Sequence, residues 1–143
     1  MTALGADHDR IIAENNALSE VPAPPFKEAA KAKAFYELFS KLGLTDVTID
    51  QEGNVTGVRK GKGNGPLLAV ASHLDTVFPE GTDVKVKRDG DILRGPGIGD
   101  NSRGLAVMLG LVRALGSCDA QLFSGAHGLP GLSDDADRKS TRL

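Results

Sequence analysis

The stretch of sequence that decides the fold is residues 67–104, LLAVASHLDTVFPEGTDVKVKRDGDILRGPGIGDNSRG. It begins with an apolar run, residues 67–71, and this run leads into SHLD at residues 72–75. An apolar run without polar alternation suits a β-strand that is covered on both faces. The stretch ends with a glycine-rich turn, residues 95–99, and the acidic Asp100 before a helical pattern. Two acids and one histidine thus lie at the ends of regular elements, where they could form a divalent metal site.

Three residues carry this interpretation. His73 and Asp75 lie two apart, so they share one face if the strand continues that far. Asp75 then either binds metal together with His73 or fixes the orientation of its imidazole. Asp100 follows glycines that let the backbone turn sharply, just before a helix N-terminus, where a carboxylate could cap the helix, bind a metal or bridge two metals.

A phosphate site is the main alternative for the glycine-rich turn. Residues 95–104, however, contain neither G-x-x-x-x-G-K-S/T nor G-x-G-x-x-G, the two motifs in which backbone amides hold phosphate groups. Asp100 would also repel an anion at this position. The sequence therefore favours metal over phosphate or nucleotide.

The rest of the chain alternates between helical and strand patterns. Helices are predicted over residues 8–19, 26–42 and 102–115; strands over 46–50, 54–59 and 67–71; and a hairpin over 84–93 that turns at Asp89-Gly90. The helix over 26–42 is expected to end at Gly43 and to bury a stripe of Ala30, Ala34, Leu38 and Leu42 flanked by Phe35 and Phe39, with its lysines in solvent. This alternation predicts an α/β sandwich.

Composition excludes several classes of protein. The chain has 143 residues, 40% hydrophobic and 25% charged, with a net charge of -2. These values are ordinary for a globular protein, and nothing in them attracts nucleic acid or an anionic membrane. The single cysteine, Cys118, rules out an internal disulfide framework and favours a reducing compartment. With neither a signal-like apolar region nor a membrane-spanning run, the predicted location is the cytoplasm.

Two blocks of the chain resemble a known family. SHLDTV at residues 72–77 and GPGIGDN at residues 95–101 are similar to the signature blocks of the co-catalytic zinc metallopeptidases of family M20. This family includes glutamate carboxypeptidase, acetylornithine deacetylase, succinyl-diaminopimelate desuccinylase and tripeptide aminopeptidase. VPAPPFKE at residues 21–28 resembles the family's N-terminal segment. The resemblance spans about residues 8–115 and implies an incomplete catalytic domain, a three-layer α/β sandwich with a mixed central sheet.

The resemblance also implies a role for each residue of the site. His73 would bind one zinc ion, Asp75 would hold that histidine, and Asp100 would bridge two zinc ions, with a cis peptide bond to Asn101. A zinc-activated water would then cleave an amide bond of a small peptide or an N-acyl amino acid. Cobalt or manganese could replace zinc, and full-length members are often homodimers. The alternative function is a non-catalytic peptide-binding or interaction module on the same fold.

The resemblance ends near residue 116. We therefore predict that residues 1–116 are the N-terminal part of a metallopeptidase catalytic domain and that residues 117–143 are an off-family tail produced by a frameshift or an adapter. The last glutamate is Glu80, so the glutamate pair that the family uses as general base and ligand is missing. His127 lies in a segment that matches no family block. The chain is accordingly expected to lack activity.

Overall fold

The computed structural model describes residues 7–60, 67–115 and 120–124. The helical elements are α2 (His8–Ser19), α3 (Ala29–Phe39), the short η1 (Ser40–Leu42), the irregular η2 (Ile98–Ser102) and α4 (Arg103–Ala114). The strands are β1 (Thr45–Ile49), β2 (Val55–Arg59), β3 (Ala69–Val70), β4 (Lys87–Asp89), β5 (Ile92–Arg94) and β6 (Ala120–Ser124). Within these residues no helix combines the length and the apolar character that crossing a membrane requires.

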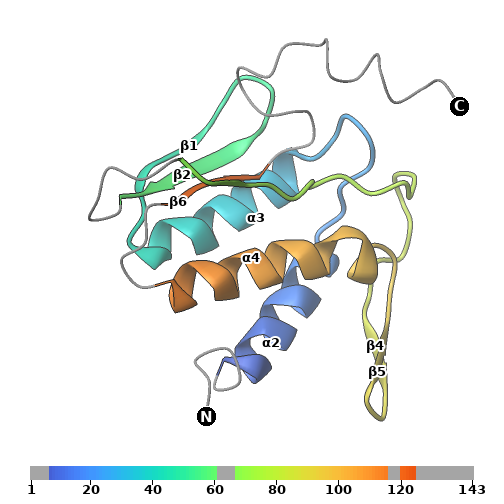
Figure 1. Cartoon of the computed structure of the whole chain (residues 1–143). Coiled ribbons are helices and arrows are strands. Elements are labelled where there is room, and N and C mark those ends of the chain that lie inside the picture. Colours follow the sequence, from blue (N-terminus) through green and yellow to red (C-terminus); the bar gives the residue numbers. More distant parts are fainter. Residues whose placement is uncertain (1–6, 61–66, 116–119, 125–143) are drawn as a thin grey trace, which may run out of the picture.

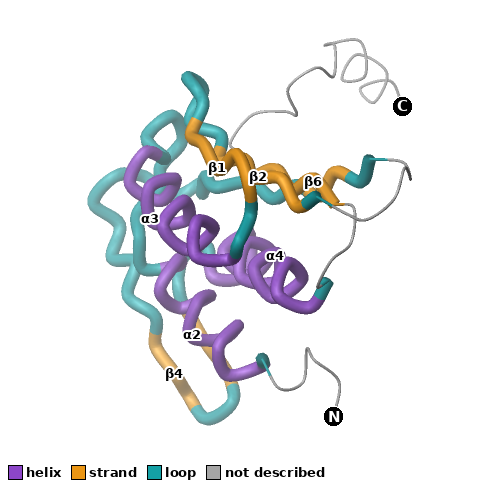
Figure 2. The backbone as a smooth tube through the Cα atoms, turned by 90° about the vertical axis from the view of Figure 1, so that its left-hand side faces the viewer, coloured by secondary structure: helices purple, strands orange, loops and turns teal. Residues whose placement is uncertain are grey.

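Four strands form one sheet in the order β1-β2-β6-β3. β1 pairs with β2 and β2 with β6 in antiparallel fashion, whereas β3 runs parallel to β6, so the sheet is mixed. α3 and α4 lie against one face of it, and α2 lies beyond α4 (Figures 1 and 2). The predicted α/β class with a mixed sheet is confirmed, and the described residues supply the sheet and one helical layer.

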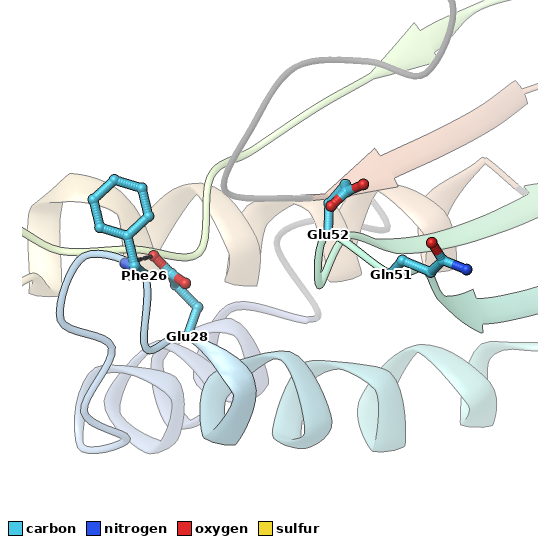
Figure 3. Close-up of a pocket in the computed structure, with 4 residues that line it drawn as sticks. All are labelled: Phe26, Glu28, Gln51 and Glu52. Carbon is cyan, nitrogen blue, oxygen red and sulfur yellow. Dashed lines mark hydrogen bonds between the residues drawn. The ribbon is translucent and has the colours of Figure 1, made fainter.

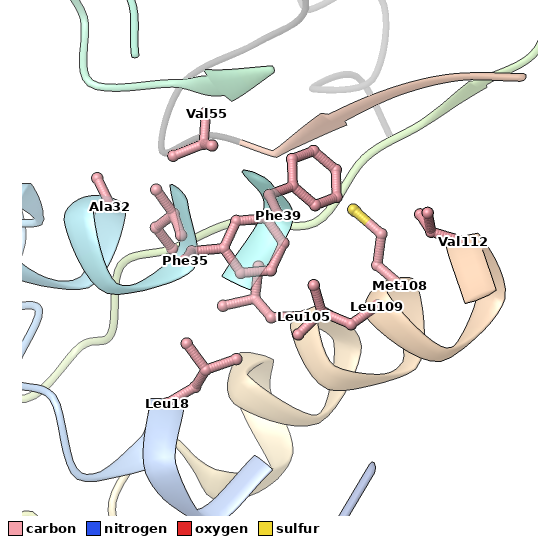
Figure 4. Packing of buried hydrophobic residues seen from close by; sticks show 10 residues of the cluster. Leu18, Ala32, Phe35, Phe39, Val55, Leu105, Met108, Leu109 and Val112 are labelled. Carbon is pink, nitrogen blue, oxygen red and sulfur yellow. The ribbon is translucent and has the colours of Figure 1, made fainter. Parts of the chain in front are cut away.

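The hydrophobic core lies between the sheet and the helices (Figure 4). Phe35 and Phe39 of α3 are fully buried, and their ring centroids are 4.9 Å apart. Gly57 of β2 makes room for Phe39, since a Cβ atom there would lie 3.1 Å from its ring. The core cluster consists of Leu18, Ala32, Phe35, Phe39, Val55, Leu74, Leu105, Met108, Leu109 and Val112. Burying a side chain of this size contributes about 1.5 to 3 kcal/mol.

α3 faces the core with a different stripe from the predicted one. Ala30 is exposed and Ala34 only partly buried, whereas residues 31, 35 and 39, one helical turn apart, are buried. The prediction that the lysines of this helix lie in solvent was wrong for Lys31, which is 1% exposed. The two phenylalanines fix the stripe because they carry the most apolar area, and Lys31 extends it by one turn. Burial lowers the pKa of Lys31 to about 8.

The buried Lys31 makes stability depend on pH. The pKa of this lysine is about 8 in the folded chain against 10.5 as a free group. Between these values the unfolded chain binds more protons, so the free energy of unfolding rises as pH rises through this window. Replacing Lys31 with methionine is therefore expected to stabilise the chain by up to about 3 kcal/mol at pH 7 and by little above pH 10.5.

Chemical denaturation of wild type and Lys31→Met at several pH values checks this expectation. Lys33→Met is the matched control, because Lys33 lies on the same helix and is exposed. Its effect should stay within about 0.5 kcal/mol at each pH. A Lys31→Met difference that does not change with pH would contradict the expectation.

Two details of the strands differ from the predictions. β3 is at the edge of the described sheet, and Leu67, just before it, is 71% exposed, so the run that was expected to be covered on both faces is not covered here. An apolar run shows that a strand is suited to burial, but the elements that lie against it decide its exposure. In the β4–β5 hairpin, Asp89 pairs with Ile92, which makes Gly90-Asp91 the turn, one residue later than predicted. Gly90 has a φ of +58°, the value that a turn of this kind favours at its first position.

β6 falls inside the segment that was predicted to be an off-family tail. Its backbone pairs with β2 over five residues and with β3 over two, so residues 120–124 take part in the sheet. Residues 125–143, which include His127 and the adapter-like end, lie outside the described part of the chain. The division of the chain at residue 116 stays a prediction.

Candidate metal centre

Burial alternates along residues 73–76, and this alternation decides which way the side chains of His73 and Asp75 point. Leu74 and Thr76 are buried, and His73 and Asp75, between and beside them, are only partly buried. In an extended segment neighbouring side chains point to opposite faces, so anchoring Leu74 in the core turns His73 and Asp75 outward together. The segment is held in place by Thr76, whose backbone N–H and hydroxyl both donate to the carbonyl of Ala23, at 2.8 and 3.1 Å.

The imidazole of His73 lies between two carboxylates. Nδ1 is 3.0 Å from Oδ1 of Asp75, and Nε2 is 2.8 Å from Oδ1 of Asp100. If a metal ion bound to Nε2, the proton on Nδ1 could be donated to Asp75, which is the arrangement that metal-binding histidines commonly have. Of the two roles considered for Asp75, this geometry favours the one in which it orients His73.

Asp100 reaches His73 because the glycine-rich turn brings it there. Gly97 has a φ of +71°, and a Cβ atom on it would lie 2.7 Å from the Cγ2 of Thr76, so the turn packs directly against the segment that carries His73. The N–H of Ser102 donates to the carbonyl of Gly97 and closes the turn at 3.1 Å. The prediction that His73 and Asp100 converge from separate segments is confirmed. The peptide bond from Asp100 to Asn101 is cis, as the resemblance implied.

His73 and Asp100 offer part of the donor set that a divalent ion needs. The side chain of Asp100 is 87% exposed, and among the described residues its carboxylate contacts the imidazole of His73. One imidazole nitrogen and one carboxylate oxygen side by side fit part of a zinc site. No group of three or more histidine, cysteine, aspartate or glutamate side chains that could hold a metal exists among residues 7–60 and 67–115. The residues present thus fit a partial site, and any further ligand lies outside this part of the chain.

A buried positive charge acts on this site, and sequence reasoning missed it. Asp75 is a charge partner of Lys31 on α3, and its attraction raises the pKa of Lys31 while the stronger effect of burial lowers it. The four-residue spacing of Lys31, Phe35 and Phe39 was the signal that could have revealed this burial. Asp75 therefore interacts electrostatically with the buried Lys31 as well as with the imidazole of His73.

A hollow elsewhere on the surface is lined by Phe26, Glu28, Gln51 and Glu52 (Figure 3). Phe26 and Glu28 come from the loop before α3, and Gln51 and Glu52 from the turn between β1 and β2. Phe26 is 83% exposed and has a φ of +63°, which is unusual for a bulky residue. Its N–H donates to Oε1 of Glu28 at 2.7 Å. None of the candidate metal ligands lines this hollow, so it is separate from the metal centre.

Comparison with known proteins gives one family and several relatives. The sequence pattern of Peptidase family M28 matches residues 54–126, which is more than half of the chain. A putative LysW-lysine/LysW-ornithine hydrolase of Pyrococcus abyssi is 39% identical over 92 residues, which cover 64% of this chain and 26% of that protein. A protein of the same description from Pyrococcus furiosus is 42% identical over 60 residues, 42% of this chain and 18% of its own length. The chain thus spans about a quarter or less of these relatives.

Solved structures share the fold. The dipeptidase Dug1p of Saccharomyces cerevisiae superposes with a TM-score of 0.70 at 15% identity, covering 85% of this chain and 33% of that one. Aminopeptidase PepT of Bacillus cereus gives 0.67 at 24% identity, with 81% and 35% covered. The YxeP protein of Bacillus subtilis, described as a dinuclear metal-binding peptidase from the M20 family, gives 0.60 at 18% identity, with 84% and 35% covered. At these identities the likeness concerns the fold alone.

Proposed function

The chain belongs to peptidase family M28, within the M28/M20 type of zinc peptidases, and from this premise we propose that it carries part of the centre of a metal-dependent hydrolase of amide bonds. The observation that carries the proposal is the contact of His73 Nε2 with Asp100 Oδ1 at 2.8 Å, with Asp75 on the opposite ring nitrogen. His73 and Asp100 would hold the metal, and Asp75 would fix the ring of His73.

The chemistry of the donors favours zinc. One imidazole with carboxylates suits zinc best, and cobalt and manganese also accept such ligands. A bound zinc lowers the pKa of a water molecule and polarises a carbonyl group. The chain's own contribution is to place the carboxylate of Asp75 3.0 Å from Nδ1 of His73, where it would orient the ring while Nε2 binds the metal. Asp100, exposed next to this nitrogen, adds the negative charge that a divalent ion needs.

The proposed substrates are small peptides or N-acyl amino acids. The archaeal relatives are named putative LysW-lysine/LysW-ornithine hydrolases, and the two structural neighbours are named an aminopeptidase and a dipeptidase, which supports an amide bond as the target. We also propose that the 143-residue chain alone does not turn over substrate, because its last glutamate is Glu80 and neither His73 nor Asp100 is available as a general base once it binds metal.

Metal binding and turnover of the purified chain test this proposal. Zinc is expected to bind with a dissociation constant on the order of 0.01 to 0.1 mM, since two of the usual four ligands supply about half of the binding free energy. No cleavage of a panel of dipeptides and N-acetyl amino acids is expected. Cleavage that a chelator abolishes would refute the proposed inactivity. If the chain instead bound no zinc and still bound peptide in the presence of chelator, the non-catalytic module would be favoured.

A further inference from the structure

Besides the contact of His73 with Asp100, a second side-chain hydrogen bond joins the two segments that carry the candidate ligands. Nδ2 of Asn101 donates to Oγ of Ser72 at 2.5 Å, and both side chains are partly buried. Ser72 directly precedes His73, and Asn101 directly follows Asp100. The bond therefore connects the neighbours of both candidate ligands, 29 residues apart in the sequence.

Gly104, in the first turn of α4, makes this bond sterically possible. A Cβ atom on Gly104 would lie 2.1 Å from Oδ1 of Asn101 and 2.8 Å from Oγ of Ser72. Real Cβ atoms do not approach other atoms so closely, so even an alanine would displace the side chain of Asn101. The glycine is needed here for the close approach of another side chain to the helix backbone.

Nothing else among the described residues holds the carboxylate of Asp100 toward His73. Its side chain is largely exposed and contacts Nε2 of His73. Its backbone position is set on one side by the turn at Gly97 and on the other by Asn101, whose φ of -132° and ψ of 23° are not helical. The side chain of Asn101 is thus the point at which the loop after Asp100 is attached to the segment before His73.

We propose that Ser72, Asn101 and Gly104 form a clamp that positions His73 and Asp100 for a divalent ion. The binding of a metal ion rests on the proposed function, whereas the clamp itself rests on the geometry of the described residues. Residues that orient metal ligands in this way typically change metal affinity by about 10- to 100-fold when they are replaced. Ser72, Asn101 and Gly104 are positioning residues, since none of them is proposed to touch the ion.

Zinc titration of the 143-residue chain by calorimetry tests the clamp. Ser72→Ala and Asn101→Ala are each expected to weaken zinc binding about tenfold or more, and the double variant no more than either single one, because both remove the same bond. Gly104→Ala should weaken zinc binding to a similar degree. Single variants within twofold of wild type, or losses that simply add, would overturn the clamp.

Gly110→Ala is the matched control for Gly104→Ala. It makes the same change in the same helix, and its Cβ would lie 2.8 Å from the Cδ1 of Ile11, away from the candidate centre. We expect it to lower the thermal midpoint and to leave zinc affinity within twofold of wild type. If Gly110→Ala weakened zinc binding as much as Gly104→Ala, a general loss of stability would explain both and the clamp would be rejected.

A metal-free measurement separates failure of the clamp from failure of the proposed function. The nitrogen-15 chemical shifts of the His73 ring at one fixed pH report its contact with Asp100, and the Asp100→Ala variant gives the value without that contact. With the clamp, Ser72→Ala and Asn101→Ala should move the shifts toward the Asp100→Ala value. A wild type that binds no zinc refutes the proposed function, and ring shifts unchanged by both substitutions refute the clamp.

Discussion

Replacing His73 with alanine is expected to abolish zinc binding by the chain at the candidate centre. His73 supplies the only imidazole among the described residues near Asp100, and Nε2 lies 2.8 Å from that carboxylate. Losing it leaves one exposed aspartate, which binds zinc no better than any surface carboxylate. Asp100→Ala should have the same effect, and Asp75→Asn, which only disturbs the orientation of the ring, should weaken binding by about 10- to 100-fold. In a longer form of the protein that cleaves amides, the first two changes should abolish turnover.

Two exposed residues serve as controls for this series. His8 at the start of α2 and Asp89 in β4 are of the same chemical types and lie in solvent. His8→Ala and Asp89→Ala should leave the calorimetric titration within twofold of wild type, and circular dichroism should show all variants folded. Zinc binding that survives His73→Ala and disappears with His8→Ala would place the metal elsewhere and refute the assignment of His73 and Asp100.

Local signals predicted the elements that depend on neighbouring residues. The helix over residues 8–19 and the strand pair around Glu52-Gly53 occur where periodicity and turn residues placed them. For the helix predicted over 26–42, the predicted end at Gly43 was correct, and Gly43 has a φ of +69°. The predicted buried face of this helix was wrong, because the alanine stripe has the right spacing but much less apolar area than the phenylalanines. Which strand lies beside β3 depends on contacts between distant residues, and no local pattern shows that.

In the candidate site, too, local sequence patterns predicted some features, and contacts between distant residues decided the others. The shared face of His73 and Asp75 came from strand alternation, and the burial of Leu74 confirms it. The convergence of Asp100 on His73 was predicted from the resemblance of two sequence blocks to a zinc peptidase family. The electrostatic attraction between Lys31 and Asp75 connects residues 44 positions apart along the chain, and the bond from Asn101 to Ser72 connects residues 29 positions apart. Only the packed structure reveals them. Metal binding by these residues stays a prediction.

A second large effect is expected from Arg113, which joins α4 to α2. Its guanidinium donates to both carboxylate oxygens of Glu14 at 2.9 Å and to Asp7, and its side chain is 15% exposed. Burial opposes its charged form, but the hydrogen bonds to Glu14 and Asp7 outweigh this and raise the pKa of Arg113. Arg113→Ala would leave the buried Glu14 without its main partner and is expected to lower the free energy of unfolding by about 3 kcal/mol or more.

Denaturant unfolding of three variants measures this effect. Arg10 also bonds to Glu14, at 3.1 Å, but its side chain is 56% exposed, so Arg10→Ala should cost less than about 1 kcal/mol. The double variant Arg113→Met/Glu14→Gln should recover part of the loss, since it removes both charges and keeps the packing volume. The energy of an ion pair depends on how much water surrounds it. Arg113 and Arg10 share the acidic partner Glu14 but differ in exposure, so comparing their variants measures the effect of burial. Equal losses for Arg113→Ala and Arg10→Ala would show that the pair between α2 and α4 contributes no more than a surface contact.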